Sequence, residues 1–233
     1  MDNFIKELLK DEFVVECYKK IDETNTFPSN HGMKHILNTL EIAKNFENLL
    51  NLDERDITIL ETCLILHDIG QVKGRFEHSY SSMELAEEIL KKYKYFDVTE
   101  LGSIYFAIMK HDITHDHSKL GTRMEWLVNL IDKLDFSKNR LEENYREKFD
   151  YSVYEEIERL EFSLIDNVFK IKIIKIENPN TISVKELLSR NLFSKAMLTF
   201  KNFCEKFGYT PKVFLENEEL DLEFIDLNVI VER

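Results

Sequence analysis

The sequence predicts a mainly α-helical protein with a small α+β segment at its C-terminal end. Through most of the first two thirds of the chain, apolar residues recur three or four positions apart, which is the spacing of one helix face. From Val168 to Ile176, apolar residues alternate with lysine instead, as is typical of a β-strand. We therefore expect a helical domain over residues 1–158 and an α+β appendage over residues 159–233.

Six helices are expected in the helical domain. Pro28-Ser29-Asn30 interrupts the first pattern and opens the second helix. The run from Ile57 to Leu66 is apolar on nearly all sides, which is typical of a central buried helix, and Gly70 provides its stop. The expected ranges are about 4–22, 31–50, 54–68, 79–94, 98–111 and 121–138.

The appendage is expected to contain one helix and a hairpin besides the strand. Ser183 and Glu186 form a capping box for a helix that runs to Phe207, where Gly208 and Pro211 stop it. The segments 213–215 and 220–231 are then expected to pair as two strands.

Composition excludes several kinds of function. With 43% hydrophobic and 32% charged residues, the chain resembles a soluble globular protein. A formal net charge of −13 disfavours nucleic-acid duplexes as partners but allows small phosphorylated molecules near a local cation. No apolar run reaches the roughly 20 residues of a membrane span, and the N-terminal residues do not resemble a signal peptide, so we expect no membrane partner and a cytoplasmic location.

Histidine and carboxylate are the candidate metal ligands, because the three cysteines are far apart and outside any CxxC spacing. All seven histidines lie between His31 and His117. On a helix, the adjacent His67 and Asp68 point about 100° apart, and both reach an ion beside the helix end. His35 and Asp132 lie on inward helix faces and could complete the site. Taken singly, His67 could also be a buried structural histidine and Asp132 a solvated carboxylate.

The ordered set resembles the HD-domain metal-dependent phosphohydrolases over roughly residues 28–138. The resemblance is carried by His31-Gly32-Met33-Lys34-His35, Leu64-Ile65-Leu66-His67-Asp68-Ile69-Gly70 and Asn129-Leu130-Ile131-Asp132-Lys133-Leu134-Asp135. It implies an HD-domain helical bundle in which His35, His67, Asp68 and Asp132 hold a first divalent ion. It also implies hydrolysis of a phosphoester by water that the metal activates.

Two further segments resemble those that hold a second ion in two-metal members of the family. They carry His78 and His111, and in those members the aspartate of the HD pair bridges the ions. The cyclic-dinucleotide phosphodiesterases have a Gly-Tyr-Pro motif that is absent after His111, so that specificity is not implied. His78 could also be a solvated residue at a helix start, and His115 and His117 lie in a polar loop, where solvated histidines are expected.

We therefore expect an HD-type phosphohydrolase, a phosphomonoesterase or phosphodiesterase, with one or two divalent ions (Mn²⁺, Fe²⁺ or Mg²⁺). Its substrate would be a nucleotide, a cyclic nucleotide or a sugar phosphate. Asp68 would orient the attacking water, and Lys73 and Arg75 would hold phosphate oxygens unless they form only a solvated basic loop. Two alternatives stay open: a di-iron oxygenase on the same ligands, and a non-catalytic nucleotide-binding or regulatory module. A homodimer is also compatible with the sequence.

Overall fold

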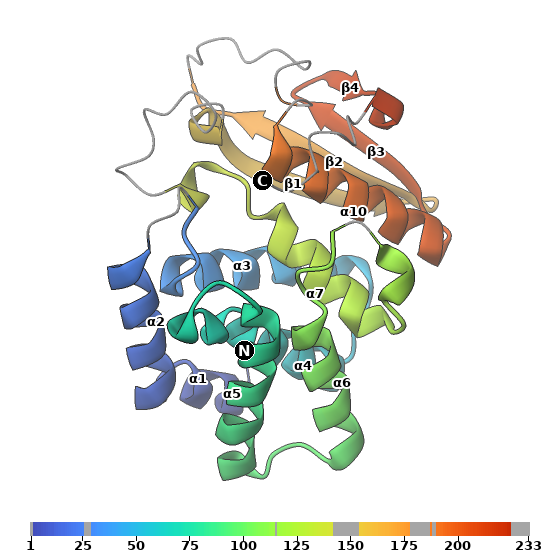
Figure 1. Ribbon diagram of the computed structural model, residues 1–233. Helices are drawn as coiled ribbons and strands as arrows, with labels where there is room; N and C mark the ends of the chain where they lie inside the picture. The colour runs from blue at the N-terminus through green and yellow to red at the C-terminus, as the bar shows by residue number, and fades with distance from the viewer. Residues whose placement is uncertain are drawn as a thin grey trace. The chain divides into compact units, whose positions relative to one another are not determined.

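The computed structural model describes residues 2–25, 29–114, 116–141, 154–177, 187 and 190–224 (Figure 1). The chain divides into two compact units. The first contains Met1–Ile113 and Ser118–Asp132, and the second contains Thr114–His117 and Lys133–Arg233. The expected fold class is confirmed: the protein is mainly helical with a small α+β part at its C-terminal end. The domain boundary expected at residue 158 stays a prediction.

Helices make up the first unit (Figure 1). One helix was expected over residues 4–22, but the structure has two, because the Asp11 carboxylate accepts hydrogen bonds from the backbone N–H groups of Phe13 and Val14 and caps a new helix. The helices are α1 (Asn3–Leu8), α2 (Glu12–Thr24), α3 (Met33–Leu49), α4 (Glu54–Leu66), α5 (His78–Tyr93), α6 (Val98–Met109) and α7 (Arg123–Leu134), the last of which ends in the second unit.

Helix α4 is the central element of the first unit, as its apolar sequence predicts. Every residue from Thr58 to Leu66 is buried, and the helix packs against α1, α3, α5 and α6. It ends at Leu66, two residues earlier than expected, and a 3₁₀ helix, η1 (Ile69–Lys73), follows. His67 and Asp68 therefore lie where the α-helix changes into the 3₁₀ turn.

Gly70 allows η1 to lie directly against α5. Its N–H donates to the Ser82 hydroxyl at 2.8 Å. A Cβ at this position would lie 2.7 Å from the backbone carbon of Ser81 and closer still to backbone atoms of Ser82 and His78. Only glycine therefore permits this approach, which joins the turn after Asp68 to the start of the helix that carries His78.

The second unit contains a four-stranded sheet in the order β1-β2-β3-β4, with α10 (Asn191–Phe207) packed against it (Figure 1). Strands β1 and β2 are antiparallel, β2 and β3 parallel, and β3 and β4 antiparallel. Phe169 contributes to the core through edge-to-face contacts with Phe200 and Phe203 of α10. The strands are β1 (Ile157–Ile165), β2 (Val168–Lys175), β3 (Thr210–Leu215) and β4 (Glu218–Leu220).

Strand β1 was not expected from the sequence. Its inward residues alternate with charged and polar ones, and Asp166 and Asn167 have the positive φ angles, 49° and 62°, of a tight hairpin turn. Leu160, Phe162 and Leu164 pair with Ile173, Ile171 and Phe169 of β2.

The rest of the appendage agrees in part with expectation. Helix α10 ends at Phe207 with Gly208 in the left-handed region, as predicted, whereas Ser183 and Glu186 lie outside the described residues. The last strand ends at Leu220 and a 3₁₀ turn, Leu222–Phe224, follows it, so the longer strand expected over 220–231 is wrong within the described part. No helix of the described residues is both long and apolar enough to span a bilayer.

Candidate metal centre

Three histidines of the first unit are oriented by the same local hydrogen bond. In each, Nδ1–H donates to the backbone carbonyl three residues earlier, at 2.7–3.0 Å, so that Nε2 is directed away from its own turn. The pairs are His67 with Leu64, His78 with Arg75 and His111 with Ile108.

The Asp68 carboxylate lies between two groups of imidazoles. Its Oδ1 is 3.3 Å from His78 Nε2 and 3.5 Å from His111 Nε2. Its Oδ2 is 3.5 Å from His67 Nε2 and 3.7 Å from His35 Nε2. One oxygen therefore faces each pair, an arrangement in which a single carboxylate can bridge two ions.

Asp132 of α7 completes the group around Oδ2. Its Oδ1 lies 3.1 Å from His35 Nε2 and 3.5 Å from His67 Nε2. All six expected ligands thus converge. Three overlapping triads have every ligand atom within 4.8 Å of the others: His35, His67 and Asp68; His67, His111 and Asp132; and Asp68, His78 and His111.

These positions fit a divalent cation. Metal–nitrogen and metal–oxygen bonds of about 2.1 Å place neighbouring ligand atoms about 3.0–3.4 Å apart, close to the separations found here. The imidazole lone pairs and the two carboxylates also form an electron-rich cluster, with His35, His67, Asp68 and His111 buried. Burying such a cluster is costly unless positive charge compensates it.

The pKa values show how strongly these groups interact. Burial alone would raise the pKa of Asp68, but the charges of His67 and His31 and a hydrogen bond from His111 hold it well below its usual range. Burial would lower the pKa of His78, but its hydrogen bond to Asp68 and the charge of that carboxylate raise it to about 9. Burial lowers the pKa of His31 and of His111.

Further residues hold Asp68 and the end of α4 in place. His31 Nδ1 lies 2.9 Å from Oδ2, and the Gln71 amide donates to Oδ1 at 2.7 Å. Tyr18, fully buried on α2, donates its hydroxyl proton to the Ile65 carbonyl at 2.5 Å near the end of α4. These contacts come from residues without a shared spacing, so only the position of His31 in the entry motif was a sequence signal.

Asn129 fixes the turn that carries His111. Its buried side-chain amide nitrogen lies 3.1, 2.7 and 2.9 Å from the carbonyl oxygens of Lys110, His111 and Ile113. An amide NH₂ group has two protons, so three carbonyls share them. The same helix, α7, therefore supplies Asp132 and the residue that holds the His111 backbone.

A cavity of about 100 Å³ opens at this cluster. Arg75 is the one lysine or arginine among the lining residues that the structure describes, whereas Lys73 lies outside the lining, with Nζ 3.4 Å from Glu84. The structure thus places Arg75, and not Lys73, at the cluster. The lining residues are His31, Asp68, Arg75, His78, His111, Asp112 and Asp132.

His117 belongs to the second unit and does not join the cluster. It was expected to be solvated, but it is buried: Asn202 donates to its Nδ1 at 2.9 Å, and its Nε2–H donates to the Thr199 hydroxyl at 3.1 Å. Both ring nitrogens are therefore occupied by α10, which gives His117 a structural role. His115 lies outside the described residues.

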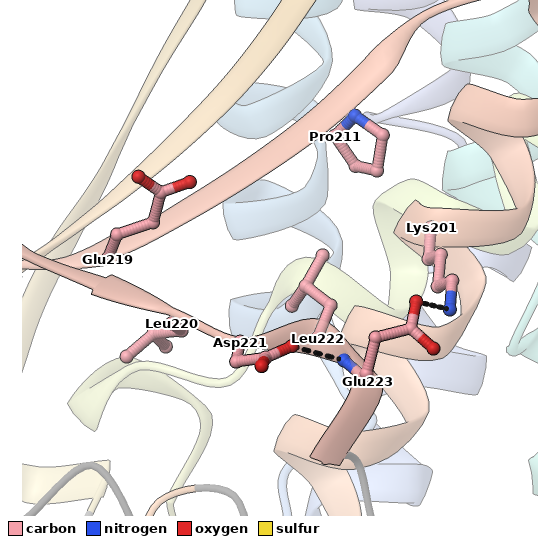
Figure 2. Close-up of a pocket in the computed structure, with 7 residues that line it drawn as sticks. All are labelled: Lys201, Pro211, Glu219, Leu220, Asp221, Leu222 and Glu223. Atoms are coloured by element: carbon pink, nitrogen blue, oxygen red, sulfur yellow. Dashed lines mark hydrogen bonds and ion pairs between the residues drawn. The ribbon is translucent and has the colours of Figure 1, made fainter.

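The second unit has a larger cavity, of about 350 Å³, bordered by three carboxylates (Figure 2). Glu223 pairs with Lys201 at 2.7 Å, and the Asp221 carboxylate accepts from the Glu223 backbone N–H at 2.9 Å. Glu219 pairs with Lys212 at 3.0 Å. These carboxylates already have partners, and none of the described residues that line the cavity is a histidine.

This chain is similar to known proteins over more than half of its length. An uncharacterized protein of Clostridium beijerinckii (strain ATCC 51743 / NCIMB 8052) is 31% identical over 142 residues, which are 58% of this chain and 83% of that protein. A crystal structure described as a predicted HD superfamily hydrolase, from an uncultured Thermotogales bacterium, is 19% identical with a TM-score of 0.44, over 60% of this chain and 80% of that one. The model of the HD domain matches residues 32–168, more than half of the chain. This protein therefore belongs to the HD-domain family.

Proposed function

We propose that this protein is a metal-dependent phosphohydrolase that acts on a small phosphoester. The observation that carries the proposal is the position of Asp68, with one carboxylate oxygen facing His78 and His111 and the other facing His35 and His67. A carboxylate shared between two imidazole pairs is suited to hold two divalent cations close together.

The donor set indicates the kind of metal. It combines imidazole nitrogen with carboxylate oxygen and contains no thiolate, which favours Fe²⁺, Mn²⁺ or Mg²⁺ in one or two positions. When bound, the metal would supply Lewis acidity toward a phosphoryl oxygen and toward water.

The protein's own groups would orient the reactants. Asp68 is held by Gln71 and His31, so its carboxylate has a fixed direction in the cavity lining. Arg75 lines the same cavity, and its planar guanidinium is suited to make paired hydrogen bonds with two oxygens of a phosphoryl group. Burial of the cluster excludes water and strengthens these interactions.

The test is a panel of phosphomonoesters, phosphodiesters, nucleotides and cyclic dinucleotides, assayed for phosphate or alcohol release with Mn²⁺, Fe²⁺ or Mg²⁺. Metal content is measured in parallel. Asp68→Ala and His67→Ala should lose bound metal and lower turnover roughly a hundredfold or more. His117→Gln is the matched control, because it removes a buried histidine of the second unit and should leave metal content unchanged.

The same experiment separates the alternatives. An oxygenase on these ligands would consume O₂ and require iron. A binding module would gain thermal stability with a nucleotide yet release no product, since binding alone stabilises a fold. Full metal content in both Asp68→Ala and His67→Ala would contradict the proposed metal ligands. Absence of metal-dependent turnover across the panel would contradict the proposed hydrolase activity.

A further inference from the structure

The cavity at the metal cluster is too small for a whole nucleotide or sugar phosphate. Its volume is about 100 Å³. Cavities that enclose an organic ligand of ordinary size have about 300–1,000 Å³. A phosphoryl group therefore fits inside, and the organic part of a substrate has to lie outside the mouth.

Phe76 is unusually exposed and lies in the chain between two residues that line the cavity. Its neighbour Arg75 and the nearby His78 both line the cavity, while Phe76 itself is 89% exposed. An exposed aromatic ring leaves apolar surface in water, and an aromatic or planar ligand that stacks on it removes that surface.

The backbone around Phe76 is restrained by its neighbours. Glu77 has a left-handed φ of 52°, uncommon for a residue other than glycine, and its carbonyl accepts hydrogen bonds from the N–H groups of Tyr80 and Ser81 in α5. The Arg75 carbonyl accepts from the His78 imidazole at 3.0 Å. The segment that carries Phe76 is therefore anchored on both sides to the helix start that positions His78.

We propose that Phe76 determines substrate specificity: the preferred substrates are phosphate monoesters whose phosphoryl group enters the cavity beside Arg75 and whose planar organic part stacks on Phe76. This inference rests on the proposed function. A monoester needs one exit for its organic part, whereas a diester has to bring two substituents out of a cavity of about 100 Å³.

The test compares Phe76→Ala with the wild-type metal-loaded protein on matched substrates. For p-nitrophenyl phosphate, kcat/KM should fall roughly tenfold, mainly through KM, as expected for lost aromatic stacking. For glycerol phosphate, which has no ring, kcat/KM should be unchanged. Phe76→Trp should retain the wild-type preference, and bis(p-nitrophenyl) phosphate should be a poorer substrate than the monoester.

Val98→Ala is the control for removal of an exposed apolar side chain. Val98 is 84% exposed and begins α6, whereas His111 follows the other end of that helix, about 18 Å away for 12 helical residues. Its kinetics should match the wild type. Three results would overturn the inference. They are an equal loss of kcat/KM on both substrates in Phe76→Ala, no loss on the aromatic substrate, or faster turnover of the diester than of the monoester.

Binding of two phosphonates distinguishes failure of this inference from failure of the proposed function. Phenylphosphonate should bind the metal-loaded protein more tightly than methylphosphonate, by calorimetry, and Phe76→Ala should abolish the difference. If the preference is present but no ester is hydrolysed, the specificity stands and the hydrolase is wrong. If esters are hydrolysed but the phosphonates bind equally, the hydrolase stands and the role of Phe76 is wrong.

Discussion

Replacing Gly70 by alanine should disturb the metal centre through backbone packing alone. The added Cβ would lie 2.7 Å from the Ser81 carbonyl carbon, whereas ordinary contact begins at 3.4 Å. The start of α5 or the η1 turn must therefore move by at least 0.7 Å. Because the obstructing atoms are backbone, a rotamer change cannot relieve the contact, and the cost should be about 1–3 kcal/mol.

The displacement acts on both sides of the site. Gly70 follows Asp68 by two residues, and the atoms that it contacts belong to the turn that begins with His78. The Asp68 Oδ1 to His78 Nε2 separation of 3.3 Å should therefore change. We expect weaker metal binding at the position that Asp68, His78 and His111 would form, by on the order of tenfold or more, since small misplacements at a site carry large penalties.

Gly102→Ala is the matched control for this substitution. Gly102 lies inside α6, and a Cβ there would meet no atom within 4 Å. Alanine should stabilise that helix by about 0.5–1 kcal/mol. The measurements are urea unfolding of the metal-free variants and calorimetric metal titration. Gly70→Ala with wild-type stability and wild-type metal affinity would refute the packing argument.

Two more predictions concern pH and Asn129. The metal-free protein should be most stable near pH 6.5. The pKa of His78, raised from 6.5 to about 9, gives stability that is present below pH 6.5 and lost as pH rises through 9. The lowered pKa values of His31 and His111 give stability that is present above 6.5 and lost as pH falls. Urea midpoints at pH 5.5, 6.5 and 8.5 in chelator test this, and stability that still rises between pH 7 and 9 would contradict it. Asn129→Asp should destabilise the fold by about 1–3 kcal/mol and lower the affinity for metal at His111, because a carboxylate replaces the donor that faces three carbonyls. Urea unfolding and metal analysis measure both effects, and wild-type values would show that those hydrogen bonds are dispensable.

Helical spacing predicted most helices of the first unit and four of the residues that meet at the cluster. Helical spacing places His35 and Asp132 on inward faces, and the end of an apolar helix places His67 and Asp68 beside them. The ordered motifs then added His78 and His111.

The supporting contacts could not be predicted in the same way. These contacts are hydrogen bonds to backbone or carboxylate oxygens whose positions are set only after the helices pack. They are made by Tyr18, Gln71 and Asn129. No periodic pattern marks such residues. The break at Asp11 was missed because apolar spacing continues across it while a side chain caps the new helix.

The histidine hydrogen bonds have a consequence for how such a centre tolerates motion. Each ring takes its direction from a carbonyl within its own four-residue segment, so the accepting carbonyl moves with the imidazole when the surrounding helices shift as rigid bodies. Ring orientation is thus a local property, and only the spacing between segments depends on the tertiary fold. Each histidine is therefore oriented by its own segment, namely 64–67, 75–78 or 108–111. Moving one such segment into another helical protein should also transfer the direction of its Nε2.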